Sequence, residues 1–364
     1  MKIVQVQTQA EAAGAQRVSD MVGEGLRGRG HAVRTVFMYR KTDAYDADPH
    51  ADFALRERPR GMGGQLRAVF ALIGYMRREK PDAVISYQHF GNVFGTLAGR
   101  LAGARFLIAN QSGAPFTKGL PAFASFIDKL MGTLGIYQYS ITNSAWTERQ
   151  FAQYPSAYRR RLRRIDHGVY PPPQPYDRMK SRQHFGLPME APLVVSSGRL
   201  VPSKKFAVLV RALALLPDTH LAIAGAGPEH DTLLALAREL GVLDRLHPVG
   251  EVQRATIHQF LAAGNVYAFG SVLETFGLAV VEAAVSGLPV VCSDLPVLQE
   301  VLTTDRGVNA AVFVPPDDPE AYAKAIGAVL GDETLRQHLS AAGRALANQY
   351  APARMCERYE QLLR

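Results

Sequence analysis

Apolar positions recur along the chain with two alternating periods. Short apolar runs typical of buried strands alternate with longer stretches in which apolar residues recur every three or four positions, typical of helices. Strands separated by helices predict βαβ units with parallel sheets, and so an α/β fold. We expect strands at 2–7, 31–39, 83–87, 106–110 and 139–142, and then at 193–197, 220–224, 247–250, 266–269, 289–293 and 311–314.

Helical patterns fill most of the intervals between these strands. Residues 41–60 are polar, contain prolines and have no period, which predicts a long loop. Residues 158–164 read Tyr-Arg-Arg-Arg-Leu-Arg-Arg and predict a basic helix. The other helices are expected at 14–29, 66–78, 93–101, 120–134, 145–154 (capped by Asn143 or Ser144), 206–216, 229–240, 255–262, 278–286, 297–302, 319–330, 333–348 and 352–364.

The proline-rich segment 170–175 divides the two series of elements. Proline removes a backbone donor and cannot continue a helix or a central strand, so this segment predicts an interdomain connection. A chain of 364 residues also suggests two domains. We expect Rossmann-like domains at 1–170 and 171–348, facing a cleft, and a terminal helix at 349–364 that packs back on the first domain. Ligands of such sheets bind beyond the carboxyl ends of the strands.

Composition narrows the class of protein. Apolar residues make up 47% and charged residues 20%, ordinary values for a globular chain with a real core. The two cysteines cannot build a disulfide scaffold or a cysteine metal cluster. No apolar run is long enough for a membrane span, and the first residues predict a strand rather than a signal segment. We therefore expect a cytoplasmic protein.

Charge is distributed unevenly between the halves. Residues 1–180 carry 26 Lys and Arg against 14 Asp and Glu, whereas residues 181–364 carry 15 against 19. A basic half beside an acidic half suggests different partners for each, and the candidates for the basic half are anionic lipid, an anionic substrate and nucleic acid. Nucleic acid is not expected, because no recognition module is present.

Three segments of the second half carry candidate chemistry. At 270–283 a strand ends, Glu274 stands in the turn and a helix begins near Gly277, whose unpaired N–H groups suit a diphosphate. Glu282 lies on that helix, and the two glutamates suit hydroxyl groups of a sugar and a ribose. At 196–205 a turn after a strand holds Arg199 and Lys204, a plausible diphosphate clamp.

The third segment, 224–229, reads Ala-Gly-Ala-Gly-Pro-Glu after a strand. It begins like a dinucleotide fingerprint, but His230 stands where the third glycine belongs, so NAD is not expected. The spacing of Asp46 and Asp48 resembles that of metal-dependent sugar transferases, yet it falls in a polar loop and is interpreted as chance. Taken alone, the two glutamates of the first segment are also compatible with a capping carboxylate and a solvated helix residue, and the second segment with a basic surface loop.

Together the three segments resemble glycosyltransferase family 4, retaining sugar transferases of the GT-B fold. The matching stretches are Gly198–Lys204, Gly225–Glu229 and the two glutamates 274 and 282, in the family's order. The later Gly-Leu-Pro-Val-Val at 287–291 and Glu300 also resemble the family's pattern. The resemblance is specific in the second half of the chain. It implies a nucleotide-diphosphate sugar, of UDP or GDP type, as donor substrate, and no metal or other cofactor.

The resemblance also implies roles for individual residues. Arg199 and Lys204 would bind the donor diphosphate and stabilise the leaving nucleotide, Glu274 would contact the transferred sugar, and Glu282 would hold the ribose. These roles make Arg199, Lys204 and Glu274 the expected catalytic residues. The other donor-binding residues are expected to be Gly14, Gly198, Gly225, Gly227, Ser271, Thr275, Phe276, Gly277 and Leu278.

One position departs from the family pattern. Many members carry a histidine just after the strand that matches 106–110, whereas this chain has Gln111, which cannot titrate. His89, after the preceding strand, is the other candidate sugar contact, although a histidine that packs the sheet end is an alternative. His167 replaces a common asparagine and is interpreted as structural.

Aromatic and basic residues of the first half suggest a membrane surface. The 158–164 arginines would favour anionic lipid, and Phe116, Leu120, Phe123, Phe126 and Ile127 would lie at the interface. A solvated basic face and core aromatics explain the same pattern equally well.

The sequence thus predicts a retaining glycosyltransferase of the hexosyltransferase type that acts on a hydroxyl acceptor. The acceptor would be a polysaccharide, a glycolipid or a small molecule, as in cell-envelope polysaccharide synthesis. One alternative is another GT-B enzyme, an epimerase or a phosphorylase. A second alternative is a catalytically silent subunit that binds nucleotide sugar, which Gln111 favours.

Overall fold

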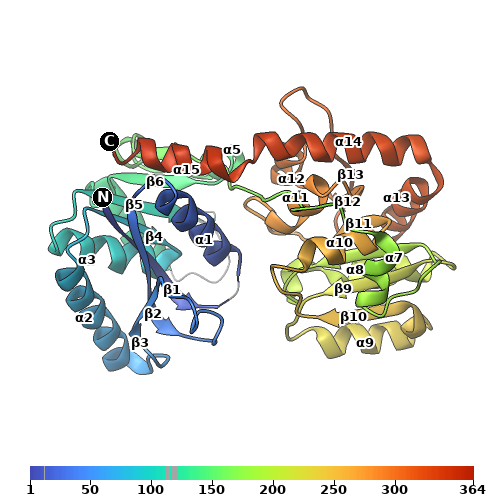
Figure 1. Cartoon of the computed structure of the whole chain (residues 1–364), viewed down its shortest axis with the longest axis horizontal. Helices are drawn as coiled ribbons and strands as arrows, with labels where there is room; N and C mark the ends of the chain where they lie inside the picture. The colour runs from blue at the N-terminus through green and yellow to red at the C-terminus, as the bar shows by residue number, and fades with distance from the viewer. Residues whose placement is uncertain (12, 112, 114, 116–121) are drawn as a thin grey trace. The chain divides into compact units, whose positions relative to one another are not determined.

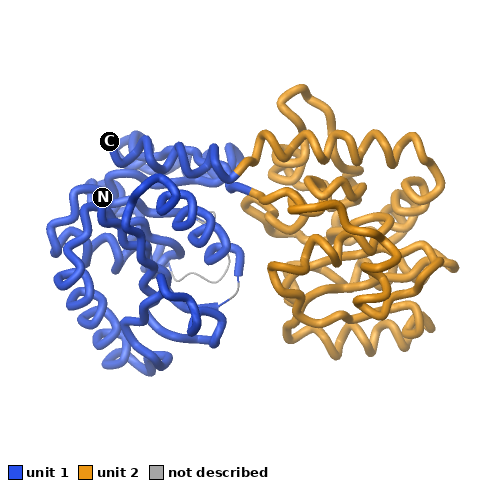
Figure 2. Tube along the Cα trace, in the orientation of Figure 1, with its two compact units in different colours: residues 1–168, 352–364 blue, residues 169–351 orange. Residues whose placement is uncertain are grey.

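The computed structural model describes residues 1–11, 13–111, 113, 115 and 122–364, which form two compact units (Figures 1 and 2). Unit 1 comprises Met1–Gly168 and Pro352–Arg364, and unit 2 comprises Val169–Ala351. The chain therefore leaves unit 1 just before the proline-rich segment. It returns for its final helix, α15 (Pro352–Gln361), which lies against α1 (Gly14–Arg27) of unit 1.

Unit 1 is built on a sheet of seven parallel strands. Their order is β3-β2-β1-β4-β5-β6-β7, and β1 pairs on both sides, with Ile3 opposite Val33 and Ala83. The strand order reverses beside β1, because the chain first proceeds to one side of β1 and then to the other. The strands are β1 (Lys2–Ala10), β2 (Ala32–Arg40), β3 (Ala51–Leu55), β4 (Ala83–Tyr87), β5 (Phe106–Gln111), β6 (Tyr139–Thr142) and β7 (Leu162–Arg164).

Helices cover both faces of this sheet. Val4 and Val6 of β1 pack with Leu72 and Met76 of α2 (Gly61–Glu79), whereas Gln5, on the other face, bonds to Ser19 of α1. The alternation of β1 side chains thus separates two helical layers. The remaining helices are the π-helix η1 (Gly91–Gly95), α3 (Thr96–Leu101), α4 (Ala122–Thr133), α5 (Ala145–Gln150) and α6 (Ser156–Arg159).

Unit 2 repeats this architecture with six parallel strands in the order β10-β9-β8-β11-β12-β13. The strands are β8 (Leu193–Ser197), β9 (His220–Ala224), β10 (Leu246–Gly250), β11 (Val266–Phe269), β12 (Val290–Ser293) and β13 (Ala311–Val314). The helices are α7 (Arg178–His184), η2 (Pro202–Lys204), α8 (Phe206–Ala214), α9 (His230–Glu239), η3 (Leu243–Arg245), α10 (Ile257–Ala263), α11 (Leu278–Val285), α12 (Pro296–Val301), α13 (Pro319–Gly331) and α14 (Glu333–Gln349).

Two Rossmann-like parallel sheets confirm the predicted α/β fold class. The loop predicted at 41–60 is wrong in part, because β3 lies inside it and pairs with β2. A half-buried edge strand has only one neighbour, so its sequence needs no strong apolar run. Asp52 of β3 is fixed by Arg34, at 2.6 Å, and by the Tyr75 hydroxyl, at 2.6 Å, neither of which a local pattern can reveal.

The predicted basic helix at 158–164 is also wrong. Residues up to Arg159 complete the short helix α6, and Leu162–Arg164 form β7, the edge strand beside β6. Tyr158 and Leu162 are buried and hold this segment against unit 1. Exposed arginines lie between and after these two residues. Charged side chains on an edge strand also discourage pairing with other chains.

The helix predicted at 145–154 starts as expected and stops early. The Ser144 hydroxyl accepts the Thr147 N–H at 3.1 Å, so Ser144 is the cap. The helix ends at Gln150, and Pro155 disfavours helical geometry for the residue before it. The helix predicted at 93–101 begins instead with the π-turn of η1, and α7 lies where no helix was predicted.

Candidate functional site

The reversal of strand order in unit 2 falls between β8 and β11. Loops that leave neighbouring parallel strands in opposite directions open a crevice at the carboxyl ends, where ligands of doubly wound sheets bind. The loop after β8 contains Arg199 and Lys204, and the loop after β11 contains Glu274. The topology therefore gathers at one edge the residues that the sequence pointed to separately.

The loop after β8 is short and firmly held. The Leu200 N–H donates to Ala226 O at 2.9 Å, and Leu200 is buried, which leaves the neighbouring Arg199 side chain exposed. Lys204 ends η2, and Lys205 takes a left-handed conformation, φ +50°, before α8. This turn directs the two consecutive lysines differently, because Lys205 pairs with Asp317 at 3.0 Å and Lys204 turns to the loop after β11.

Lys204 and Glu274 meet directly. The Lys204 Nζ donates to Glu274 Oε1 at 2.5 Å and lies 5.4 Å from the centre of the Phe269 ring. The two loops are joined a second time at Ser203 O, which accepts the Val272 N–H at 3.0 Å and the hydroxyl of the buried Ser271. A cation and a carboxylate separated by 70 positions along the chain are thus held together.

The helix α11 begins at this edge. Gly277 precedes it with φ +82°, and the first intrahelical bonds run from the Val280 and Val281 N–H groups to Gly277 O. The N–H of Leu278 comes before these bonds, so it has no intrahelical acceptor at the positive end of the helix dipole. The side chain of Phe276 is buried against Tyr350, with ring centres 5.2 Å apart, so the expected donor contact there is confined to its backbone.

Two further residues of this segment differ in exposure. Thr275 is half-buried in the turn before α11, whereas Glu282, on the second turn of α11, is buried to 3% exposure. A carboxylate enclosed to that degree needs polar partners and keeps a fixed orientation. Glu282 is therefore enclosed in the packed interior of unit 2 and is not a solvated glutamate on the helix surface.

The glycines of the two neighbouring loops are required by packing. A Cβ on Gly225 would lie 1.9 Å from Gly198 O, and a Cβ on Gly227 would lie 2.3 Å from Leu200 O. The Gly198 N–H donates to Ala224 O at 3.0 Å, so the loop after β8 rests on the loop after β9. The close approach of two backbones explains these glycines without any ligand.

Unit 1 has its own reversal point, between β1 and β4. Gly14 opens α1 and is exposed, after β1. His89 follows β4 directly after Gln88, which takes a left-handed φ of +62° and accepts the Thr8 N–H at 3.1 Å. Burial lowers the pKa of the half-buried His89, although the charge of Asp128 acts in the opposite direction. The lowered pKa of His89 favours its neutral imidazole.

Gln111, at the end of β5, belongs to a polar cluster inside unit 1. Its Nε2 donates to Asp128 Oδ1 at 3.1 Å, to Ser140 Oγ at 3.2 Å and to Tyr158 OH at 3.1 Å. Tyr158 OH donates to the other carboxylate oxygen of Asp128 at 3.1 Å. Asp128 is 5% exposed, and burial raises its pKa. The amide nitrogen of Gln111 is thus occupied by a structural network.

Sequence reasoning missed Asp128, Gln88 and Thr8. Asp128 lies in the aromatic helix α4. In the sequence, a single acidic residue in a helix looks like a solvated residue, and only its burial in the structure shows that Asp128 is not one. The left-handed conformation of Gln88 has no signal in the sequence, since glutamine is not a residue that favours it. In the described part of the chain, no cluster of three or more His, Cys, Asp or Glu is arranged to hold a metal ion.

His167 has the environment of a structural residue. Its Nε2 lies 3.1 Å from Asn143 Nδ2, its Nδ1 is buried, and burial lowers its pKa to about 4. Because the folded-state pKa lies below the ordinary value of 6.5, the unfolded chain binds the proton first as the pH falls. We expect the free energy of unfolding to decrease between pH 6.5 and about 4 on this account.

Urea unfolding of the wild type and of His167→Gln across this pH range checks the expectation. The substitution keeps a polar group near Asn143 and removes the titration, so the curve of the variant should be flatter between the two pKa values. Parallel curves for the two proteins would contradict the assignment.

Comparison with known proteins relates the chain to glycosyltransferases. Residues 177–346, nearly all of unit 2, match the family model described as glycosyl transferases group 1. The chain is 35% identical over 209 residues to the D-inositol 3-phosphate glycosyltransferase of Xylanimonas cellulosilytica, covering 54% of this chain and 49% of that protein. It is 33% identical over 183 residues to the lipopolysaccharide core biosynthesis glycosyltransferase LpsE of Rhizobium meliloti, covering 50% and 52%.

The chain thus spans about half the length of the curated relatives that it matches. Solved structures resemble it over its whole length. The Anabaena Alr3699/HepE structure in complex with UDP and glucose has a TM-score of 0.86 at 20% identity and covers 100% of this chain and 99% of that one. The glycosyltransferase WaaG, involved in lipopolysaccharide biosynthesis, has a TM-score of 0.75 at 16% identity, with 99% of each chain covered. The fold is therefore the GT-B fold of these glycosyltransferases, and unit 2 matches the group 1 model.

Proposed function

We propose that this protein is a retaining glycosyltransferase of family 4 that moves a sugar from a nucleotide-diphosphate sugar to a hydroxyl acceptor. The observation that carries the proposal is the contact of Lys204 with Glu274 beside the N-terminus of α11. A cation, a carboxylate and the N-terminus of a helix at the carboxyl edge of a parallel sheet match the three parts of such a donor. Unit 2 then supplies the donor site, and unit 1 the acceptor site.

The parts of the donor fit distinct groups of unit 2. The diphosphate suits the N-terminus of α11 together with Lys204 and the exposed Arg199, since all three are positive. Glu274 uses Oε1 for Lys204 and retains Oε2 for a sugar hydroxyl. The buried carboxylate of Glu282 suits the two hydroxyls of a ribose. We expect the site to need no metal ion, because fixed cations and backbone N–H groups neutralise the diphosphate.

The chemical step requires that negative charge move to the diphosphate. The acceptor oxygen attacks the anomeric carbon on the face that the phosphate oxygen leaves, so the C–O bond to the new acceptor has the original configuration. The departing phosphate oxygen takes the proton of the acceptor hydroxyl, which balances the step without a protein base. Gln111 therefore does not prevent transfer, because the step requires no titrating group at that position.

The acceptor class follows from the named relatives. Relatives include proteins named as D-inositol 3-phosphate and lipopolysaccharide core glycosyltransferases, and a structural neighbour was solved with UDP-glucose. These names favour a UDP sugar as donor and a cell-envelope saccharide or glycolipid as acceptor.

A panel of nucleotides and nucleotide sugars tests the proposal. A ligand at 100 times its dissociation constant stabilises the folded chain by about 2.7 kcal/mol, which a melting curve resolves. UDP or GDP and one of its sugars should stabilise the protein, and incubation of that sugar with a hydroxyl acceptor should yield a glycoside with retained configuration. A panel without any stabilising nucleotide would contradict the proposal.

The same assay separates the alternatives. An epimerase would convert the nucleotide sugar without an acceptor, and a phosphorylase would show the absorbance of pyridoxal phosphate. A silent subunit would bind the donor and release neither product nor free nucleotide. The occupied amide of Gln111 is the observation that keeps the silent subunit as second candidate.

Glu282 and Glu274 should differ in calorimetry with the nucleoside diphosphate alone. The ribose is present in this ligand and the transferred sugar is absent. Glu282→Gln should therefore weaken its binding by about 10- to 100-fold through loss of charge-assisted hydrogen bonds, whereas Glu274→Gln should change it by less than about threefold. Both variants should weaken binding of the nucleotide sugar. Equal losses for the nucleoside diphosphate would contradict the separate roles.

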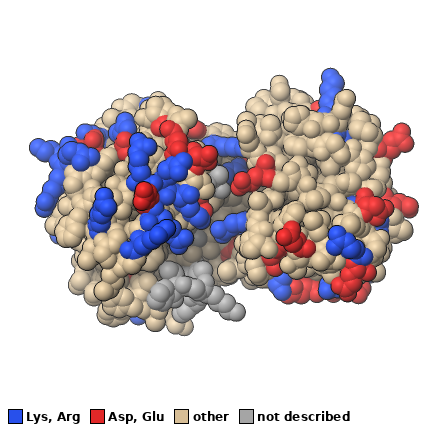
Figure 3. All heavy atoms as spheres, turned by 90° about the horizontal axis from the view of Figure 1, so that it is seen from below, with Lys and Arg blue, Asp and Glu red and all other residues tan. Residues whose placement is uncertain are grey.

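We further propose that unit 1 docks on an anionic membrane surface through exposed apolar side chains of α4, α2 and α3. Unit 1 carries 27 Lys and Arg against 15 Asp and Glu, and Figure 3 shows basic side chains gathered on one of its faces. Exposed apolar side chains follow one stripe of α4, at Phe123, Phe126 and Leu130, with Phe123 71% exposed. Similar side chains on α2 and α3 are Met62, Leu66, Phe70, Leu97 and Leu101.

The membrane residues predicted from sequence divide into three groups. Phe123 and Phe126 are exposed, Ile127 packs against the core beside Met131, and Phe116 and Leu120 lie outside the described residues. Within the described ranges, no helix has the length and apolar character needed to cross the bilayer. A peripheral contact is therefore the form of association that these side chains suit.

Sedimentation with vesicles tests the docking surface. The protein should bind vesicles of phosphatidylglycerol, lose binding at high salt, and bind phosphatidylcholine weakly. Phe123→Ser with Phe126→Ser should weaken binding by about tenfold or more, because each ring contributes about 1.5–3 kcal/mol on burial. Leu215→Ser, at an exposed leucine of unit 2, is the matched control. Unchanged binding of the double variant would contradict this surface.

A further inference from the structure

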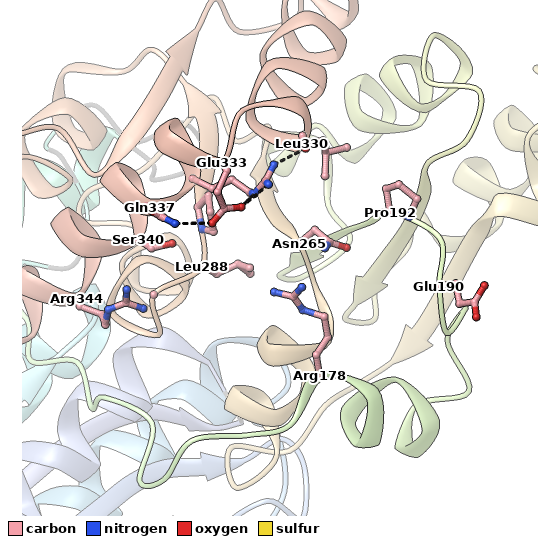
Figure 4. Close-up of a pocket in the computed structure, with 13 residues that line it drawn as sticks. Arg178, Glu190, Pro192, Asn265, Leu288, Leu330, Glu333, Gln337, Ser340 and Arg344 are labelled. Carbon is pink, nitrogen blue, oxygen red and sulfur yellow. Dashed lines mark hydrogen bonds and ion pairs between the residues drawn. The ribbon is translucent and has the colours of Figure 1, made fainter.

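A pocket of about 500 Å³ lies in unit 2 at the amino ends of the strands, at the opposite edge from the proposed donor site (Figure 4). Pro192 precedes β8, Asn265 precedes β11, and Leu288 and Pro289 precede β12. One side is a face of α14, which presents residues at positions 333, 336, 337, 340 and 344. A volume of this size accommodates a small organic molecule.

Positive charge converges on this pocket. Unit 2 is acidic overall, with 14 Lys and Arg against 18 Asp and Glu, yet three arginines line the pocket. Arg336 is occupied, because it donates to Glu333 and to the backbone oxygens of Val329 and Leu330. Arg178 and Arg344 have no hydrogen bond or ion pair to any residue that the structure describes.

The two uncommitted arginines approach the pocket from different elements. Figure 4 shows the guanidinium of Arg178, from α7, directed into the hollow between Asn265 and Leu288, with Arg344 beyond Leu288. The carboxylate that lines the same region, Glu333, is held by Arg336 and by the Gln337 amide at 2.8 Å. Glu190 lies at the other side of the pocket from Arg344.

The remaining lining suits a hydroxylated carbon skeleton. Leu288 and Pro289 give an apolar wall, and the Ser340 hydroxyl is a donor and acceptor on the α14 side. Asn265 uses its Oδ1 for Arg182 and for the Leu193 N–H, which leaves its amide N–H groups for a ligand. Guanidinium groups pair with phosphate through two parallel hydrogen bonds each.

We propose that this pocket is a second ligand site that binds a small organic phosphate, with the phosphate between Arg178 and Arg344 and the hydroxylated body against Leu288 and Ser340. The site is separate from the proposed donor site, because the two lie at opposite ends of the same strands. It does not depend on transferase activity.

Calorimetry on the full chain tests the site with glucose 6-phosphate as probe and UDP at saturation. We expect one site per chain, and weaker binding by about 10- to 100-fold in Arg178→Ala and in Arg344→Ala. Ser340→Phe, which fills the pocket and keeps both charges, should abolish binding. Arg211→Ala removes an exposed arginine of α8 and should leave binding unchanged, as should Lys204→Ala at the proposed donor site.

Four results would overturn the proposal. They are no binding of glucose 6-phosphate to the wild type, wild-type affinity in the Arg178→Ala, Arg344→Ala double variant, loss of binding in Lys204→Ala, and binding of inorganic phosphate or glucose as tight as that of the sugar phosphate. The third result would place the probe in the donor site. The fourth would show that the site does not recognise the organic body, or does not recognise the phosphate. Failure of UDP to bind would leave this test intact, since the Lys204→Ala arm still separates the sites.

Discussion

Lys204→Ala should lower the rate of sugar transfer by about 100- to 1,000-fold, or about 2.7–4 kcal/mol of transition-state stabilisation. Charge grows on the diphosphate as the sugar bond breaks, and Lys204 lies at the edge where the diphosphate is proposed to bind. Arg199→Ala should have a similar effect, because its exposed guanidinium is the second cation of the loop after β8. Product formation at saturating donor measures both effects.

The ion pair with Glu274 requires a control for folding. Loss of Lys204 leaves Glu274, whose side chain is 10% exposed, without its cation, so the melting temperature of each variant must accompany the rate. Lys324→Ala removes an exposed lysine of α13 and is the matched substitution. Near-normal turnover in folded Lys204→Ala and Arg199→Ala would disprove the assigned roles.

Gly225→Ala should destabilise the folded chain by about 2–4 kcal/mol, whether or not a ligand is bound. The added Cβ would lie 1.9 Å from Gly198 O, and the backbone of Gly225 has φ +150°, so two loop backbones must separate to admit it. Overpacking alone costs about 1–3 kcal/mol, and backbone strain adds to it. Urea unfolding of the full chain measures the loss.

Gly241 offers a control for the conformational part of this effect. It also has a positive φ, +68°, but a Cβ there would meet nothing within 4 Å. Gly241→Ala should therefore cost about 1 kcal/mol, the price of the left-handed conformation without a clash. If the two variants were equally stable, the close approach of the loops would not be the reason for glycine at 225.

The order of elements could be predicted because most strands have a local signal. Ala83–Tyr87, His220–Ala224 and Val266–Phe269 have the bounds that their apolar runs predicted. A strand buried on both faces is rich in apolar residues, so most of its length is present in the sequence. The edge strands β3 and β7 lack this requirement, and neither was predicted.

The candidate site was predictable as three loops but not as an assembled surface. Short turns between a strand and a helix keep their glycines and charges in adjacent positions, so Arg199, Lys204 and Gly277 could be found from spacing. Whether Phe276 faces a ligand or the core depends on Tyr350, far away in the chain, and the structure places it in the core. Asp128 was missed because its burial depends on Tyr158 and Gln111.

The sequence by itself determined the α/β class, the two series of strands and the chemistry available in each loop, since these depend on neighbouring residues. The tertiary structure alone decided which groups meet. The parallel order of β8 and β11 brings Lys204 to Glu274 across 70 positions, and the amino ends of the same strands gather Arg178 and Arg344. Contacts of this kind form between segments that are distant in the chain, and bringing such segments together costs loop-closure entropy. They cannot be predicted from a local sequence pattern.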